Sequence, residues 1–184
     1  MNHHDMTRNM VLAALFAALT AIGAFLQIPT GTVPITLQFL FTALAGLLLG
    51  WKWGAISQLL YVGIGLLGLP VFTQGGGIGY VLQPSFGFLL GLIPAAAVIG
   101  ALTARRTGYL TVLAAVLVGD LILYAVGVPY MYLILHVYMQ SAKTFPALLA
   151  AMLVYVPGDT LKIIVVTVLA PVLRRTLAKA VPNL

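Results

Sequence analysis

The sequence predicts an all-α integral membrane protein: a single domain over residues 1–184 that folds as a bundle of six transmembrane helices. Of the 184 residues, 62% are hydrophobic and only 7% are charged, and the mean hydropathy is +1.12. So much apolar surface needs lipid as its solvent, and in lipid the backbone polar groups must be satisfied within helices. The apolar runs are long and unbroken, whereas the strands of an outer-membrane barrel alternate polar and apolar residues.

Hydropathy divides the chain into apolar stretches at about residues 10–26, 36–50, 53–68, 84–104, 109–137 and 146–177. The second and third fall short of the ~20 residues that a perpendicular span needs. The last two are longer than a single span and contain Pro129, Pro157 and Pro171, so we expect kinks or breaks there.

The joints between these stretches alternate in charge. The basic joints and ends carry Arg8, Lys52, Arg105, Arg106, Arg174, Arg175 and Lys179. The other joints, residues 27–35, 69–83 and 139–145, carry only Lys143. Basic joints face the cytoplasm, so both termini of this multi-pass membrane protein are predicted to lie on the cytoplasmic side.

Two of the uncharged joints, residues 29–34 and 69–80, are rich in Gly and Pro yet contain apolar and aromatic side chains. Irregular backbone of this kind is tolerated at a membrane where it covers a cavity. Plain surface turns are the alternative. We interpret both joints as lids, because Phe72 and Tyr80 would be unusual residues in a plain turn.

Two charged residues, Asp159 and Lys162, lie inside the sixth apolar stretch. An ionisable side chain there costs roughly 2.5–3.5 kcal/mol on insertion scales, so it usually has a function. The two residues are three positions apart and share one helix face, and Pro157 with Gly158 favours a helix start just before them. We interpret the pair as part of an outer binding site for a small polar, anionic solute. The spacing equally fits an internal ion pair that orients the helix.

Further polar and aromatic residues are candidates for the same site. Neutral hydrogen bonds could come from Gln38, Gln74, Gln83 and Ser85, and aromatic walls from Tyr124, Tyr130, Tyr132 and Tyr155. For each of these alone, interface anchoring or core packing is the commoner role. Asp120 is a third intramembrane acid without an assigned function.

No catalytic residue, metal site or cofactor is predicted. There are no cysteines, and no arrangement resembles a nucleophile–base pair, a zinc cluster or an ATP-binding motif. The formal charge of +6 does not indicate nucleic acid, because most of the basic residues lie at the predicted membrane edges.

The first apolar stretch carries alanines at four-residue spacing, at positions 13, 17 and 21 and at 14 and 18. Small residues at this spacing let helices approach closely. The strip can pack within the chain or against a second membrane subunit.

The chain resembles the BioY family, the biotin-specific substrate-binding (S) components of energy-coupling-factor transporters. The matching segments read Val33-Pro34-Ile35-Thr36-Leu37-Gln38, Gly68-Leu69-Pro70-Val71-Phe72, Gly127-Val128-Pro129-Tyr130 and Pro157-Gly158-Asp159-Thr160-Leu161-Lys162. They follow one another along nearly the whole chain. One segment departs from the pattern, because Gln83-Pro84-Ser85-Phe86-Gly87-Phe88 stands where the family tends to read Gly-Pro-Thr-Gly-Gly-Tyr.

The resemblance implies high-affinity capture of biotin from outside, with lids formed by the outer joints. It implies partnership with a transmembrane T component and two ABC-type ATPases that hydrolyse ATP. It assigns ligand contacts to Asp159 and Lys162, and contacts with the T component to Ala14, Ala17 and Ala18. On chemical grounds, the valerate carboxylate of biotin would suit Lys162 and its ureido N–H groups Asp159. Phe72, Gln74, Tyr80, Gln83, Ser85 and Gln38 complete the predicted substrate site. The alternatives are an S component for another vitamin, such as riboflavin or thiamine, or a structural membrane subunit.

Overall fold

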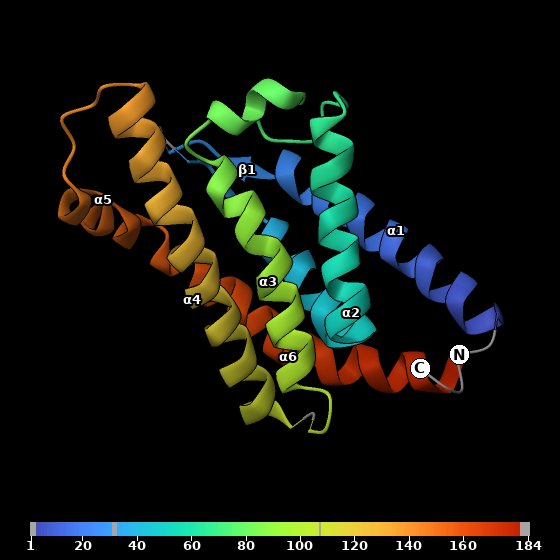
Figure 1. The fold of residues 1–184 in the computed structure, drawn as a ribbon. Coiled ribbons are helices and arrows are strands. Elements are labelled where there is room, and N and C mark those ends of the chain that lie inside the picture. The colour runs from blue at the N-terminus through green and yellow to red at the C-terminus, as the bar shows by residue number, and fades with distance from the viewer. Residues whose placement is uncertain (1–2, 31–32, 107, 181–184) are drawn as a thin grey trace.

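The computed structural model describes residues 3–30, 33–106 and 108–180 and is built almost entirely of helices (Figure 1). The α-helices are α1 (His3–Phe25), α2 (Gln38–Leu66), α3 (Phe86–Leu102), α4 (Tyr109–Leu133), α5 (Phe145–Ala151) and α6 (Val156–Ala180). The short elements are strands β1 (Gln27–Ile28) and β2 (Ile35–Thr36), the 3-10 turns η1 (Ile78–Leu82) and η3 (Met152–Val154), and the π-helical turn η2 (Ile134–Tyr138). Four stretches are long and apolar enough to cross a membrane: Asp5–Phe25, Gln38–Leu66, Tyr109–Tyr138 and Val156–Arg174. The predicted all-α, multi-pass membrane architecture is confirmed.

Helix α2 is a hairpin of two antiparallel halves that meet at Gly50. This glycine has φ 77° and ψ 177°, a conformation that residues with a Cβ rarely adopt. Across the hairpin, the Thr42 hydroxyl donates to Gln58 Oε1 at 2.9 Å, although a straight helix would separate these residues by about 24 Å. A Cβ on Gly54 would lie 2.8 Å from Gly46 Cα, so only glycine lets the halves touch. The predicted second and third spans are the two arms of this hairpin.

The predicted sixth span, 146–177, is divided near its beginning. Helix α5 ends at Ala151, η3 follows, and α6 begins at Val156 with Pro157 in its first turn. Proline fits there because the first N–H groups of a helix have no intrahelical acceptor. The expected helix start before Asp159 is therefore confirmed, and the break expected in this long stretch lies just before Pro157. Pro171 lies inside α6 without ending it.

The two alanine rows of α1 have different surroundings. Ala13 and Ala17 are buried within the chain, at 2% and 4% exposure, whereas Ala14 and Ala18 are exposed. Ala17 belongs to the hydrophobic core, so its side chain is not available to another subunit. This corrects its assignment to the docking face, for which Ala14 and Ala18 remain candidates.

The uncharged joints and the basic joints lie at opposite ends of the bundle. In Figure 1 the ribbon of β1 and the turn η1 lie at the upper end, and the joint between α3 and α4 lies at the lower end. Arg8, Gly50 and Arg174 line one hollow, so the start of α1, the α2 hairpin and the end of α6 also meet. This separation is what the predicted orientation requires, and the side that each end faces stays a prediction.

We expect a cysteine at position 79 to react with a membrane-impermeant thiol reagent in intact cells, and a cysteine at position 108 to react only after lysis. Both glycines are exposed, and a Cβ at either meets nothing within 4 Å. The chain has no cysteine of its own, so each label reports one site. Gly76 is unsuitable, because a Cβ there would lie 2.1 Å from the Leu69 carbonyl oxygen. The opposite labelling pattern would reverse the orientation.

Candidate functional site

The charged pair of α6 faces a cavity between the helices. Helices α2, α3, α4 and α6 surround it, and β2 and the joint before η1 contribute to its rim. Its apolar lining includes Phe39, Phe88, Leu89, Leu92, Leu123 and Met152. Its polar lining comprises Thr36, Gln38, Thr73, Tyr80, Ser85, Tyr124, Tyr155, Asp159 and Lys162. An apolar space with a few placed polar groups is the usual form of a ligand site.

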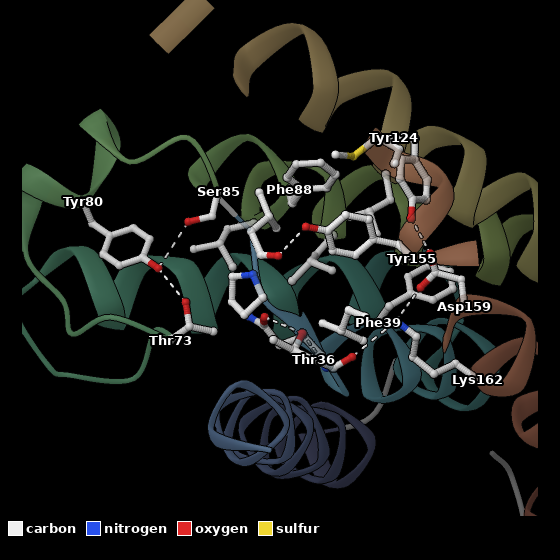
Figure 2. Close-up of a pocket in the computed structure, with 18 residues that line it drawn as sticks. Thr36, Phe39, Thr73, Tyr80, Ser85, Phe88, Tyr124, Tyr155, Asp159 and Lys162 are labelled. Carbon is white, nitrogen blue, oxygen red and sulfur yellow. Dashed lines mark hydrogen bonds and ion pairs between the residues drawn. The ribbon is translucent and has the colours of Figure 1, made fainter. Parts of the chain in front are cut away.

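Asp159 and Lys162 form a buried ion pair at one side of this cavity (Figure 2). The Lys162 Nζ lies 2.5 Å from Asp159 Oδ1, and each side chain is only 9% exposed. Lys162 also donates to the Thr36 carbonyl oxygen at 3.3 Å, and the Tyr124 hydroxyl donates to Asp159 Oδ2. Residues from β2, α4 and α6 therefore satisfy both charges. Because an ammonium has three N–H donors and each carboxylate oxygen two lone pairs, the pair retains capacity for a ligand.

A cluster of hydroxyl groups lies at the other side of the view in Figure 2. The Tyr80 hydroxyl is 2.9 Å from Thr73 Oγ1 and 3.4 Å from Ser85 Oγ. Between the two polar groups the wall is apolar, and Phe88 packs edge-on to Tyr124 with ring centroids 5.9 Å apart. The cavity thus has a charged end and a neutral hydroxyl end, joined by an apolar middle.

Tyr155 ties the β ribbon to the beginning of α6. Its hydroxyl donates to the Val33 carbonyl oxygen at 2.5 Å and lies 3.0 Å from Thr30 Oγ1. The ribbon itself has only two residue pairs, Gln27 with Thr36 and Ile28 with Ile35. So short a ribbon is not stable alone, so the contact with Tyr155 fixes the part of the joint nearest the cavity.

The structure brings together five of the predicted substrate-site residues around the cavity: Gln38, Tyr80, Ser85, Asp159 and Lys162. Gln38 is held by bonds to Tyr61 and Thr36, each at 2.8 Å.

Three predicted contacts are corrected. Gln74 and Gln83 are exposed and do not line the cavity. Phe72 is 1% exposed, but it packs between the rings of Tyr61 and Tyr80, at 5.5 Å and 4.6 Å, outside the lining.

Two of the four tyrosines weighed as walls, Tyr124 and Tyr155, line the cavity, and Tyr130 and Tyr132 do not. Thr36 and Thr73 were missed, because a threonine in a Gly/Pro-rich joint has no distinctive pattern.

Asp120 lies one turn before Tyr124 on α4, and its buried Oδ1 has no hydrogen-bond partner among the described residues. Within that same part of the chain, no group of three or more His, Cys, Asp or Glu could hold a metal ion.

Comparison with known proteins places these features in one family. The model of the BioY family matches residues 1–179. A probable biotin transporter BioY of Lysinibacillus sphaericus is 52% identical over 141 residues, which cover 76% of this chain and 72% of that protein. The biotin transporter BioY of Thermotoga maritima is 35% identical over 164 residues, covering 89% of this chain and 94% of that protein.

The fold is similar to that of a solved structure, the S-component for biotin from an ECF-type ABC transporter. The TM-score is 0.83 at 30% sequence identity, and the match covers 95% of each chain. The helical fold described above therefore agrees with a solved fold along almost the whole sequence.

We expect Tyr155→Phe to speed amide hydrogen exchange in residues 33–36 by about fivefold, because one hydrogen bond contributes about 1 kcal/mol. Exchange followed by mass spectrometry on the purified protein measures this. Tyr132→Phe is the matched control, because its ring packs against His136 and Phe145 instead. Equal exchange in Tyr155→Phe and the unsubstituted chain would show that the ribbon is held by other contacts.

Proposed function

The chain belongs to the BioY family, and on this premise we propose that it captures biotin with high affinity from outside the cell, as the substrate-binding component of an energy-coupling-factor transporter. The observation that carries the proposal is the buried Asp159–Lys162 pair facing a cavity whose lining is mainly apolar with a few polar groups. An ion pair in a membrane interior is costly to maintain, and here it lies where a solute can reach it.

The two charged atoms are only 2.5 Å apart, so one end of biotin meets both. Its ureido group carries two N–H donors and one carbonyl acceptor. Asp159 accepts from the N–H groups, Lys162 donates to the carbonyl, and the net charge of the site stays unchanged. A carboxylate at this place would be attracted by Lys162 but repelled by Asp159, at about 4 kcal/mol for a 4 Å separation near a protein surface. The ureido group therefore fits the pair better, which revises the assignment of the valerate to Lys162.

The valerate carboxylate then extends toward the hydroxyl cluster of Thr73, Tyr80 and Ser85. Hydroxyl donors form short, charge-assisted hydrogen bonds with a carboxylate. The fused rings and the methylene chain occupy the apolar middle, beside Phe39 and Phe88. The match between a ligand with two polar ends and a cavity with two polar ends favours biotin over riboflavin or thiamine. Thiamine is a cation, which Lys162 would repel.

Energy for transport comes from partner subunits in this proposal: a transmembrane T component and two ABC-type ATPases. The chain itself acts as a binding protein rather than an enzyme, and biotin is its ligand rather than a cofactor. The exposed alanines 14 and 18 of α1 form the docking face for the T component, because small side chains allow close helix approach.

Lys162→Ala should weaken binding of biotin and of biotin amide alike, by roughly 2–5 kcal/mol, or at least about 30-fold in Kd, because it leaves Asp159 buried and unpaired. Titration of the detergent-purified protein with both ligands, alongside riboflavin and thiamine, measures this. Ser85→Ala is the matched variant at the hydroxyl end of the cavity. It should weaken the binding of biotin more than the binding of the uncharged amide. If Lys162→Ala affects biotin but not the amide, Lys162 binds the carboxylate. Normal biotin binding by a folded Lys162→Ala would make the pair purely structural.

Ala14→Trp and Ala18→Trp should leave biotin binding by the isolated chain nearly intact and abolish uptake and co-purification with the T component. The indole would fill the space that close helix approach requires. Ala17→Trp is the contrasting variant, because overpacking a buried position destabilises the fold itself. Assembly and transport by the Ala14 and Ala18 variants would exclude this face as the docking site.

A further inference from the structure

A second cavity lies at the end of the bundle opposite the lids. Its lining includes Arg8 and Asn9 of α1, the Gly50 turn of α2, Gly100 of α3 and Arg174 of α6. The two arginines come from opposite ends of the chain and converge on one hollow. We call this hollow the basic cleft.

The lining of the basic cleft contains two cations, and Asp5 pairs with one of them from outside the lining. No Asp or Glu is among the described residues that line it. Arg8 lies 3.5 Å from Asp5 on the same helix, and Arg174 donates to the Thr103 carbonyl oxygen at 3.2 Å. A guanidinium has five N–H donors, and the bond to Thr103 uses one of those of Arg174. Two cations around one hollow favour an anionic occupant with several acceptor oxygens.

The remaining walls are apolar and belong to the membrane edge. Leu47, Leu48 and Leu49 line the cleft beside Trp51. Trp51 is 60% exposed and precedes an exposed lysine, a combination typical of the interface between lipid and water. Val11, three positions after Arg8 on α1 and therefore on the same face, is 63% exposed. Lipid tails thus reach the margin of the cleft.

We propose that the basic cleft binds the phosphate headgroup of an anionic phospholipid, in the leaflet that we expect to face the cytoplasm. Basic pockets between transmembrane helices on that side recognise such headgroups. A free phosphate would satisfy the arginines but would leave the exposed indole of Trp51 facing water, whereas a phospholipid matches both the charged and the apolar side chains. The proposal is independent of biotin, because this cavity and the ligand cavity share no lining residue.

Native mass spectrometry of the full chain in detergent tests this, with phosphatidylglycerol and phosphatidylcholine of identical acyl chains added at matched concentrations. We expect tighter binding of phosphatidylglycerol. Replacing both arginines, in Arg8→Gln/Arg174→Gln, should weaken that binding about 30-fold, at roughly fivefold for each basic side chain near the surface. Binding of phosphatidylcholine should not change.

Arg105→Gln/Arg106→Gln is the matched control, because it removes two exposed charges at the same end but outside the cleft lining. This control variant should retain most of its phosphatidylglycerol binding. Equal losses of binding in both double variants would show only a general electrostatic attraction between basic residues and the anionic lipid, and would overturn the proposal. A third arm adds sn-glycerol 3-phosphate, which has the phosphate without acyl chains. If sn-glycerol 3-phosphate displaces the lipid when both are at the same concentration, the cleft is a site for a free anion rather than for a lipid.

Thermal melting checks that each variant is folded. Should the cleft double variant fail to fold, Arg8→Gln alone carries the test, with an expected loss of about fivefold, and Arg8→Lys should restore most of the binding. No preference for phosphatidylglycerol in the unsubstituted chain overturns the proposal. The proposal is also overturned if Arg8→Gln/Arg174→Gln loses an acidic protein partner while its binding of phosphatidylglycerol is unchanged.

Discussion

The buried ion pair between Asp159 and Lys162 is the interaction on which the cavity end of this molecule depends. Neither charge is tolerable alone in a medium of low dielectric constant, so each needs partners that are fixed in place. Tyr124 on α4 and the Thr36 carbonyl of β2 supply them. The pair therefore joins α6, α4 and strand β2 in one network of hydrogen bonds. Removing either charge would leave the other uncompensated.

The same constraint explains why the lids are built as they are. Backbone in an irregular joint exposes N–H and C=O groups that lipid cannot satisfy. Here the first joint pairs β1 with β2 and bonds to Tyr155, and the second folds into η1 and buries Phe72 against Tyr61. Among the described residues, both joints thus hold part of their backbone in hydrogen bonds, and both contribute to the cavity lining. The opposite end, with its turn at Gly50 and its converging arginines, is built for the interface with charged headgroups.

Much of the fold was predictable, because lipid imposes a simple rule on sequence. Long apolar runs, uncharged joints that alternate with basic ones, and the Pro-Gly before Asp159 predicted the helices and their order. The hairpin in α2 followed from two short runs, which the glycine at position 50 allows to fold back. The separation of α5 from α6 agrees with the break expected at Pro157, but the sequence did not place the end of the first helix at Ala151, because residues 146–155 are as apolar as the helix that follows.

For the site, the sequence by itself determined that Asp159 and Lys162 share one helix face inside an apolar run, because the two residues are three positions apart. It also indicated a cavity beneath the Gly/Pro-rich joints. Only the tertiary structure decided which neutral residues line that cavity. A glutamine such as Gln38 or Gln74 is equally plausible in a sequence, and the direction of its side chain depends on helix rotation and loop path. The structure likewise separated Ala17 from Ala14 and Ala18, because burial is a property of neighbours that lie far apart along the chain.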